Sequence, residues 1–183
     1  MNNYNQAVVQ LARETVTRLL KNQSLPENGN EIILSPLWKE HKSCFVSIKT
    51  KNGELRGCIG TLRPLNPSLD KEIIANAISA STSDPRFPPM TKDELNNVIF
   101  SVDVLSEPEP IENITQLDPK KYGVIVSKGY RRGVLLPDLE GVDTAEQQIE
   151  IAAMKAGLRN LDGVMLERFT VTRYKEWTFS EIK

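Results

Sequence analysis

The chain has 183 residues, a formal net charge of −1 and a hydrophobic fraction of 39%. This size and composition predict one compact globular domain that buries a core of its own, with room for a smaller lobe. The near-zero charge disfavours general nucleic-acid binding, which draws on many lysine and arginine contacts to phosphate, and no apolar run reaches the roughly 18 residues that a membrane span needs.

The N-terminal residues predict the compartment, and the cysteine and histidine content disfavours a common kind of metal site. The first residues lack the basic and apolar regions of a signal peptide, so we expect a cytoplasmic protein. Its two cysteines, Cys44 and Cys58, are then expected to be reduced thiols. With a single histidine and no Cys-x-x-Cys pair, the sequence predicts no metal site and no cofactor.

The first elements in chain order are a helix and a hairpin. Apolar residues recur at helical spacing between Tyr4 and Lys21, which predicts an amphipathic helix. Two strand-like runs, Cys44 to Thr50 and Glu54 to Thr61, then flank Asn52-Gly53. Asn-Gly favours a two-residue type I′ turn because both central residues of that turn need positive φ.

This turn would determine which side chains share a face of the hairpin. With a two-residue loop, Lys51 pairs with Glu54 and Ser47 pairs with Cys58. The predicted core face then carries four apolar residues, namely Val46, Ile48, Leu55 and Ile59. Arg56 and Cys58 lie on the opposite face, which also separates Cys58 from Cys44 and prevents a disulfide between them.

A second helix and a proline-rich segment follow. The helix is expected to start at Ser68 and to end near Ser83, because Pro85 disfavours helix at the residue before it. Asp84 to Met90 reads as a stiff irregular segment, and Thr91 with Glu94 fits a capping box for a short helix. Alternating apolar residues predict a strand over 97–106.

The remaining third of the chain mixes strands with one more helix. Strands are expected over 123–127 and 133–136, around a turn at 128–132, and a single closing strand over 164–177. A helix starts near Asp143 and ends at Gly157. Without regular strand–helix–strand alternation, the pattern predicts an α+β fold with a mainly antiparallel sheet flanked by helices.

Cys58 is the candidate catalytic residue. It lies between Gly57 and Gly60, two residues after Arg56, and a nearby cation or open backbone amides would stabilise a thiolate. In the alternative interpretation, Cys58 is a small buried hydrophobe and the glycines admit a neighbouring backbone. His41 could serve as its base, although a solvated loop histidine is the simpler interpretation.

The proline-rich segment supplies the second group of candidate site residues. Prolines restrict this loop and could hold Asp84 and Arg86 in place, with Arg86 binding the carboxylate or phosphate of a small anionic ligand. The alternative is a rigid connector in which Asp84 caps local amides and Phe87 enters the core. The basic turn Lys128–Arg132, with Tyr130 at its centre, is interpreted as a solvated hairpin tip.

Several of these motifs together resemble the AMMECR family. They are Leu55-Arg56-Gly57-Cys58-Ile59-Gly60-Thr61, Ser83-Asp84-Pro85-Arg86-Phe87-Pro88-Pro89-Met90-Thr91, Gly133-Val134-Leu135-Leu136-Pro137, Lys155-Ala156-Gly157-Leu158 and the stretch from Phe169 to Tyr174. The resemblance covers nearly the whole chain. It implies a single domain over 1–183 with a larger α/β lobe and a smaller lobe.

The resemblance also implies partners. Similar microbial proteins are often encoded with, or fused to, a Memo-like protein and a radical S-adenosylmethionine enzyme. We therefore expect a binding or accessory component of a multi-protein modification system, in which Arg56, Gly57, Gly60, Asp84 and Arg86 contact a ligand or partner. The alternatives are an enzyme that uses Cys58 as nucleophile or redox thiol and, with less support, a nucleic-acid-linked regulator.

Overall fold

The computed structural model describes residues 3–176 and divides the chain into two compact units. One unit comprises Met1–Val104 with Thr172–Lys183, and the other comprises Leu105–Val171. Each unit contains one four-stranded sheet. The α+β prediction is confirmed, but the strands form two sheets where the sequence pattern suggested one.

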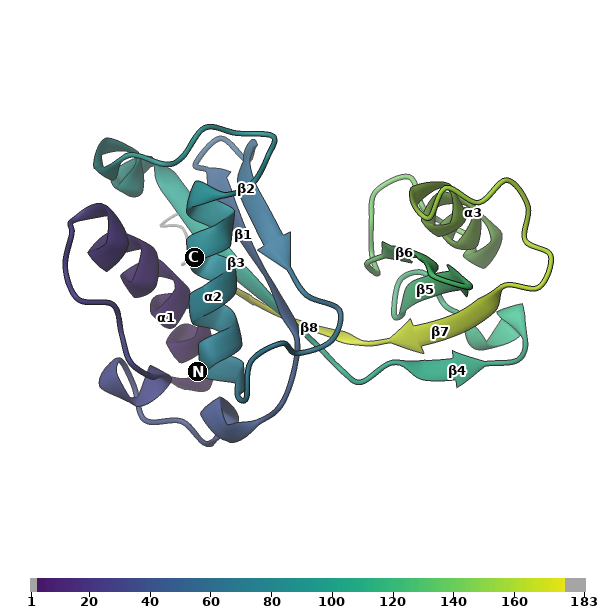
Figure 1. The fold of residues 1–183 in the computed structure, drawn as a ribbon, viewed down its shortest axis with the longest axis horizontal. Coiled ribbons are helices and arrows are strands. Elements are labelled where there is room, and N and C mark those ends of the chain that lie inside the picture. Colours follow the sequence, from purple (N-terminus) through teal and green to yellow (C-terminus); the bar gives the residue numbers. More distant parts are fainter. Residues whose placement is uncertain (1–2, 177–183) are drawn as a thin grey trace, which may run out of the picture. The chain divides into compact units, whose positions relative to one another are not determined.

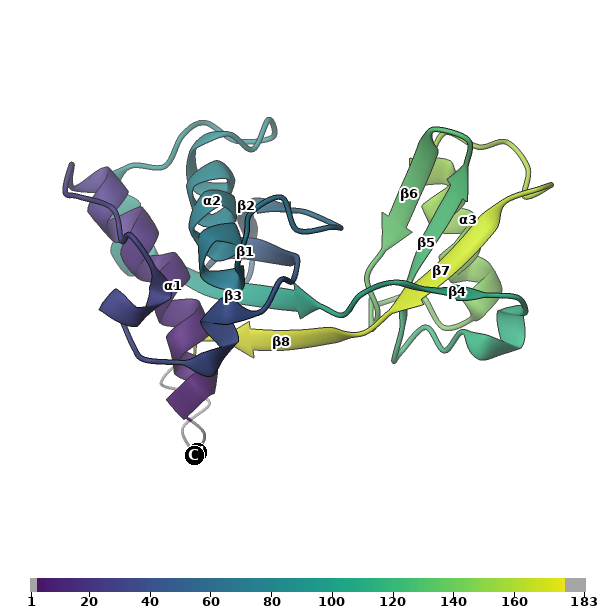
Figure 2. The ribbon, with the colours of Figure 1, turned by 60° about the horizontal axis from the view of Figure 1, so that its bottom comes forward.

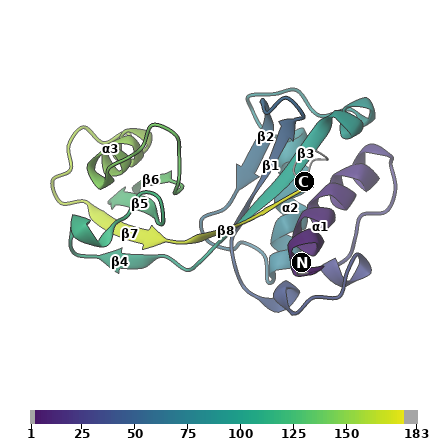
Figure 3. The same ribbon diagram turned by 180° about the vertical axis from the view of Figure 1, so that it is seen from behind.

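The first unit packs two helices on one face of a sheet (Figure 1). The helices are α1 (Asn3–Leu20) and α2 (Leu69–Thr82), and the strands are β1 (Cys44–Thr50), β2 (Leu55–Gly60), β3 (Val98–Leu105) and β8 (Val171–Lys175). The strand order is β2-β1-β3-β8, with β1 antiparallel to both of its neighbours. Figure 3 views this sheet from the face opposite to α2.

Alternation along the strands builds the core of this unit. Val46 and Ile48 of β1 and Phe100 and Val102 of β3 are fully buried and contact the apolar side of α1 and α2. Residues with the opposite parity, such as Ser47 and Cys58, lie on the other face and are half-buried. The sequence therefore placed Cys58 on the correct face of β2.

The hairpin turn differs from its prediction. The backbone N–H of Thr50 donates to the carbonyl of Glu54, and the carbonyl of Thr50 accepts from the backbone N–H of Gly53, whose φ is +92°. The loop therefore has three residues where the sequence predicted two. Lys49 pairs with Leu55 and Ile48 pairs with Gly57, which leaves Arg56 as the extra residue of a β-bulge. The expected Lys51–Glu54 pairing was wrong.

The bulge has two consequences for side-chain direction. It restores the predicted register further along, so that Ser47 does pair with Cys58. Before the bulge, however, Leu55 shares the outward direction of Lys49 and is 36% exposed. The prediction that Leu55 lies on the core face was therefore wrong, because one extra residue reverses the parity of a strand.

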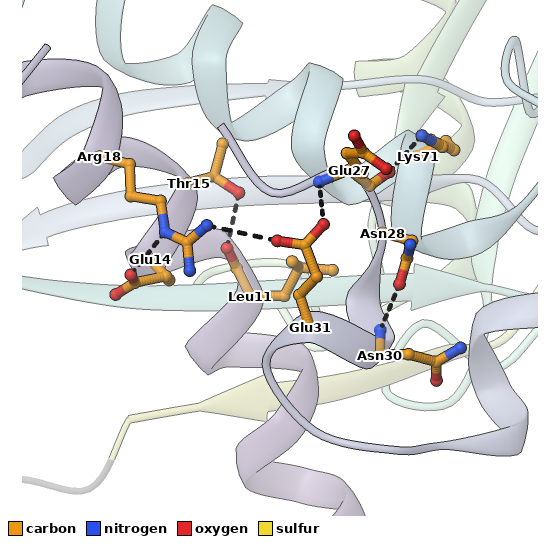
Figure 4. Close-up of polar contacts among 9 residues, drawn as sticks. All are labelled: Leu11, Glu14, Thr15, Arg18, Glu27, Asn28, Asn30, Glu31 and Lys71. Carbon is orange, nitrogen blue, oxygen red and sulfur yellow. Dashed lines mark hydrogen bonds and ion pairs between the residues drawn. The ribbon is translucent and has the colours of Figure 1, made fainter. Parts of the chain in front are cut away.

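The segment between α1 and β1 is fastened to both helices by polar contacts, which Figure 4 shows. Arg18 of α1 bonds Glu14 at 2.8 Å and Glu31 at 3.4 Å, and Glu31 also accepts from the backbone N–H of Glu27. Lys71 of α2 donates to the carbonyl of Glu27. These solvent-facing contacts add little stability individually, but together they fix the course of the segment.

The second unit packs one helix on its own sheet (Figure 2). Its strands are β4 (Glu109–Ile111), β5 (Gly123–Lys128), β6 (Arg131–Leu135) and β7 (Met165–Phe169), and its helix is α3 (Ala145–Lys155). The strand order is β4-β7-β5-β6, and β4–β7, β7–β5 and β5–β6 are antiparallel pairs. Thr144 caps α3 by accepting from the backbone N–H of Gln147.

The closing strand was predicted as one element over 164–177. The structure divides it into β7 and β8, which belong to different sheets, with Thr170 between them. Thr170 exchanges hydrogen bonds with Ser106 on the other connection between the two units. The prediction was wrong because the apolar pattern does not record which partner strand each half meets; Trp177 lies outside the described residues.

Candidate functional site

The candidate site lies on β2 at one edge of the first sheet. β2 is the terminal strand in the order β2-β1-β3-β8, so the backbone groups on its outer side have no strand partner among the described residues. Unpaired edges of this kind invite association with other strands. The proline-rich segment after α2 supplies the missing partners for β2.

Asp84 provides the central contact between these two elements. Its carboxylate accepts a hydrogen bond from the backbone N–H of Cys58 at 2.8 Å and another from the backbone N–H of Arg86 at 3.1 Å. It also accepts from Nε and Nη2 of Arg86 at 2.9 and 2.7 Å. Its side chain is only 2% exposed, so this is a buried and fully satisfied carboxylate.

Arg86 completes the clamp on the strand edge. Its Nη2 donates to the backbone carbonyl of Cys58 at 3.2 Å, while Asp84 takes the N–H of the same residue. The Asp84–Arg86 pair thus binds both outward backbone groups of Cys58, as a neighbouring strand would. The guanidinium nevertheless remains 53% exposed, and its Nη1 makes no hydrogen bond within the described part of the chain.

Electrostatics follow from this geometry. The Arg86 guanidinium, aided by the backbone N–H groups of Cys58 and Arg86, holds the pKa of Asp84 well below its usual range. In turn, the hydrogen bond to Asp84 raises the pKa of Arg86. Both shifts favour the charged forms of the pair.

The thiol of Cys58 faces away from the apolar core and is half-buried. Its Sγ shares a hydrogen bond of 3.0 Å with Oγ of Ser47 on the paired strand. His41 is an exposed residue before β1, and in the described part of the chain no hydrogen bond joins it to Cys58. The structure therefore gives the thiol a neighbouring hydroxyl but no hydrogen-bonded histidine base.

Cys44 is chemically distinct from Cys58. It is fully buried under α2, where the side-chain amide of Asn76 lies 3.6 Å from its Sγ. Burial raises the pKa of the Cys44 thiol to about 12. A thiol reagent that acts on the folded protein therefore reports on Cys58 alone.

Arg56 belongs to a neighbouring cluster. The bulge directs it to Glu94, which it meets through Nε at 2.5 Å and Nη2 at 3.2 Å, and Nη2 also donates to the carbonyl of Pro88. The same Glu94 accepts from the backbone N–H of Thr91 and completes the predicted capping box. The sequence indicated the capping role of Glu94 but missed its pairing with Arg56, which spans 38 positions.

Phe87 connects the two arginines. The Cζ atoms of Arg56 and Arg86 lie 5.9 and 5.6 Å from the centroid of its ring, within the range of cation–π contact. The connector interpretation had expected this ring to enter the core. The ring is instead half-buried. The exposed part of the site is therefore a ring between two oriented guanidinium groups.

The two glycines of the motif have evident packing roles. A Cβ on Gly57 would lie 2.1 Å from the carbonyl oxygen of Ala80 in α2, and one on Gly60 would lie 2.3 Å from the ring of Phe45. Gly57 thus lets α2 approach β2 closely, as the alternative interpretation of the motif required. A ligand contact to either glycine stays a prediction.

The described residues provide no evident metal centre. No group of three His, Cys, Asp or Glu side chains within this part of the chain is arranged to hold an ion. No described helix is long and apolar enough to cross a membrane.

Comparison with known proteins identifies the family. The AMMECR1 family model matches residues 9–179. The chain belongs to the AMMECR1 family. A Thermotoga maritima protein is 54% identical over 147 residues, which are 80% of this chain and 84% of that protein.

Two further proteins are similar to this chain. A Clostridium acetobutylicum protein is 48% identical over 168 residues, which cover 92% of this chain but only 36% of the relative. The crystal structure of the uncharacterized protein PH0010 from Pyrococcus horikoshii matches with a TM-score of 0.86 at 31% identity, covering 96% of this chain and 93% of that one. The two-lobed α+β fold inferred from the resemblance is therefore shown.

Proposed function

We propose that this AMMECR1-family protein is a non-catalytic binding component of a cytoplasmic multi-protein modification system. Its contact surface would be the arginine–ring face, defined as Arg86, Phe87 and Arg56 beside Cys58. The observation that carries the proposal is the buried Asp84 carboxylate, which fixes a half-exposed guanidinium in one orientation. A preorganised guanidinium loses little freedom when it binds an anionic group.

The charge balance favours recognition over catalysis. Arg56 and Arg86 are each paired with a carboxylate, Glu94 and Asp84 respectively, so neither is a free cation held in reserve for a thiolate. Nucleophilic thiol catalysis usually requires a base in hydrogen-bond reach. The hydrogen bond between Cys58 Sγ and Ser47 Oγ gives the thiol a packing partner but no proton acceptor of suitable basicity.

The partners in the proposal are a Memo-like protein and a radical S-adenosylmethionine enzyme, as the family resemblance implies. The Clostridium acetobutylicum relative supports an accessory role, because this chain corresponds to only 36% of that protein. A domain that forms part of a longer chain in one organism is well suited to act beside other proteins.

Binding to a purified Memo-like protein from the same organism, measured by calorimetry, tests the proposal. We expect Arg86→Lys to weaken binding by about tenfold, because lysine keeps the charge but loses the two-pronged donor geometry. Lys51→Ala removes an exposed charge at the tip of the same hairpin and is the matched control. Equal binding by wild type and Arg86→Lys, or no binding by the wild type, would contradict the proposed surface.

A Cys58 enzyme is the second candidate, and one observation favours it. The thiol is half-buried on a sheet edge, and Nη2 of Arg86 donates to the backbone carbonyl of the same residue at 3.2 Å. Cys58→Ser separates the two functions, because serine keeps the bond to Ser47 but removes the nucleophile. Normal partner binding with loss of system activity would favour the enzyme; normal binding with normal activity would favour the binding component.

Iodoacetamide kinetics provide an independent measurement of the thiol. Cys44 gives no background in the folded protein because it is buried. If Cys58 reacts no faster than a free thiol with a pKa of about 8.5 across the pH range, it is not an activated nucleophile. Faster reaction at neutral pH would support the enzyme.

A further inference from the structure

The second unit contains a pocket remote in sequence from the arginine–ring face. Its volume is about 340 Å³, near the lower end of the range of roughly 300–1,000 Å³ for small-molecule sites. Its lining residues are Lys128, Tyr130, Arg131, Leu158, Arg159 and Asn160. They come from the β5–β6 hairpin tip and from the chain that follows α3.

The sequence suggested a solvated tip for this hairpin because the tip residues form only one wall of the pocket, and the other wall comes from a distant segment. Lys128 and Arg131 are the terminal pair of the β5–β6 ladder and flank Gly129-Tyr130. The other wall begins after Gly157, which has a φ of +68° and directly follows the C-cap residue of α3. Residues separated by some thirty positions thereby line a single pocket.

Neutral carbonyl groups orient two of the three cations. Lys128 Nζ donates to the backbone carbonyl of Asp162 at 2.6 Å, and Arg131 Nη1 donates to that of Gly157 at 2.9 Å. A carbonyl partner holds a cation in position without cancelling its charge. By contrast, Arg132, the next residue, is paired with the carboxylate of Glu167 and does not line the pocket.

The third cation and the aromatic ring extend this positive surface. Arg159 makes no hydrogen bond or ion pair with the described residues. Tyr130 is 93% exposed, and Leu158 offers an apolar contact beside it. The lining contains three cations and no carboxylate.

We propose that this pocket binds a free mononucleotide. Lys128, Arg131 and Arg159 would contact its phosphate, and the base would stack on the ring of Tyr130, with the Asn160 amide available to its polar edge. Arginine and lysine suit phosphate oxygens, and an aromatic face stacks any base. A free nucleotide fits better than a nucleic-acid strand, because a strand would need a longer basic track than this near-neutral chain supplies.

Calorimetric titration of the full chain at low salt tests the pocket, with AMP, inorganic phosphate, adenosine and a short single-stranded oligonucleotide as separate probes. We expect AMP to bind more tightly than either phosphate or adenosine, and more tightly than the oligonucleotide. Arg159→Ala and Tyr130→Ala should each weaken AMP binding by about tenfold, since a charge-assisted contact and a stacked ring each contribute about that factor. Both side chains are exposed, so neither change should disturb folding.

Lys120→Ala is the matched control. It removes one positive charge from the same unit, before the start of β5, whereas the pocket lies at the other end of that strand. The proposal is overturned if AMP does not bind, if AMP binds no better than phosphate, if the oligonucleotide binds more tightly than AMP, or if Lys120→Ala weakens AMP binding as much as Arg159→Ala does. This result is independent of the partner-binding test on the arginine–ring face.

Discussion

Replacing Asp84 by asparagine should destabilise the first unit by removing the clamp on the edge of β2. The carboxylate accepts four hydrogen bonds, from the backbone N–H groups of Cys58 and Arg86 and from two nitrogens of the Arg86 guanidinium. An asparagine side chain of the same shape has one acceptor oxygen, and its NH₂ group must face a donor. At least one donor near this 2%-exposed side chain therefore loses its partner.

The magnitude follows from the unsatisfied donor. Leaving a buried polar group without a partner costs about 1–3 kcal/mol, while the lost attraction to Arg86 adds little because that guanidinium is 53% exposed. We expect a loss of about 2 kcal/mol in the free energy of unfolding, or a shift of roughly 1 M in the urea midpoint. Tryptophan fluorescence, to which the buried Trp38 of the same unit contributes, follows the transition.

The effect of Asp84→Asn should also depend on pH. The pKa of Asp84 is lowered in the folded state, chiefly by Arg86, so its carboxylate stabilises the fold fully above the unfolded pKa of about 3.9. Below that value the unfolded chain takes up a proton that the folded chain does not, and this stabilisation is progressively lost. The difference between wild type and variant should therefore be largest at neutral pH and smaller at pH about 3.

Asp93→Asn is the control for this experiment. Asp93 is exposed in the short helix after the proline-rich segment, so its amide variant should change stability by no more than about 0.5 kcal/mol. If Asp84→Asn shifts the midpoint no further than Asp93→Asn, the carboxylate does not hold the strand edge. An Asp84→Asn effect that grows as the pH falls would refute the assigned direction of the pKa shift.

Three other substitutions or modifications test separate parts of the fold. Gly57→Ala should lower stability by several kcal/mol or prevent folding, because its Cβ would lie 2.1 Å from the carbonyl oxygen of Ala80; a urea midpoint near the wild-type value would contradict this packing. Mass spectrometry after brief iodoacetamide treatment should find one label at Cys58 and a second, at Cys44, only in urea. Thr144→Ala should destabilise α3 by about 1 kcal/mol through loss of its cap, measured as earlier thermal loss of helical circular dichroism.

Local sequence patterns predicted the elements well because they depend on neighbours in the chain. The helix over 4–21 follows from apolar residues at i, i+3 and i+4, and α1 occupies Asn3–Leu20. The capping box of Thr91 with Glu94 also joins residues three positions apart, and the structure contains it. In each case the signal lies within one turn of the backbone.

The errors arose where distant segments decide the geometry. The bulge at Arg56 and the division of the last strand at Thr170 depend on which strands pair, and no local pattern records that. The Arg56–Glu94 pair and the pocket wall at Arg159 likewise join segments far apart in sequence. The face of Cys58 was nevertheless correct, because the bulge offset the wrong loop length before that residue was reached.

The Asp84–Arg86 pair has one role that the structure shows and one that we propose. Protection of a strand edge explains why Asp84 binds the N–H of Cys58. A single proline or lysine on the edge could also protect it, without a buried ion pair. It does not explain why the chain uses a buried carboxylate to orient Arg86 and leaves half of that guanidinium in solvent beside Phe87. An ordered, exposed cation is what the proposed recognition of an anionic partner group requires. The proposed binding role would use the exposed side of the Arg86 guanidinium, whereas the edge role uses the atoms that face Asp84 and Cys58.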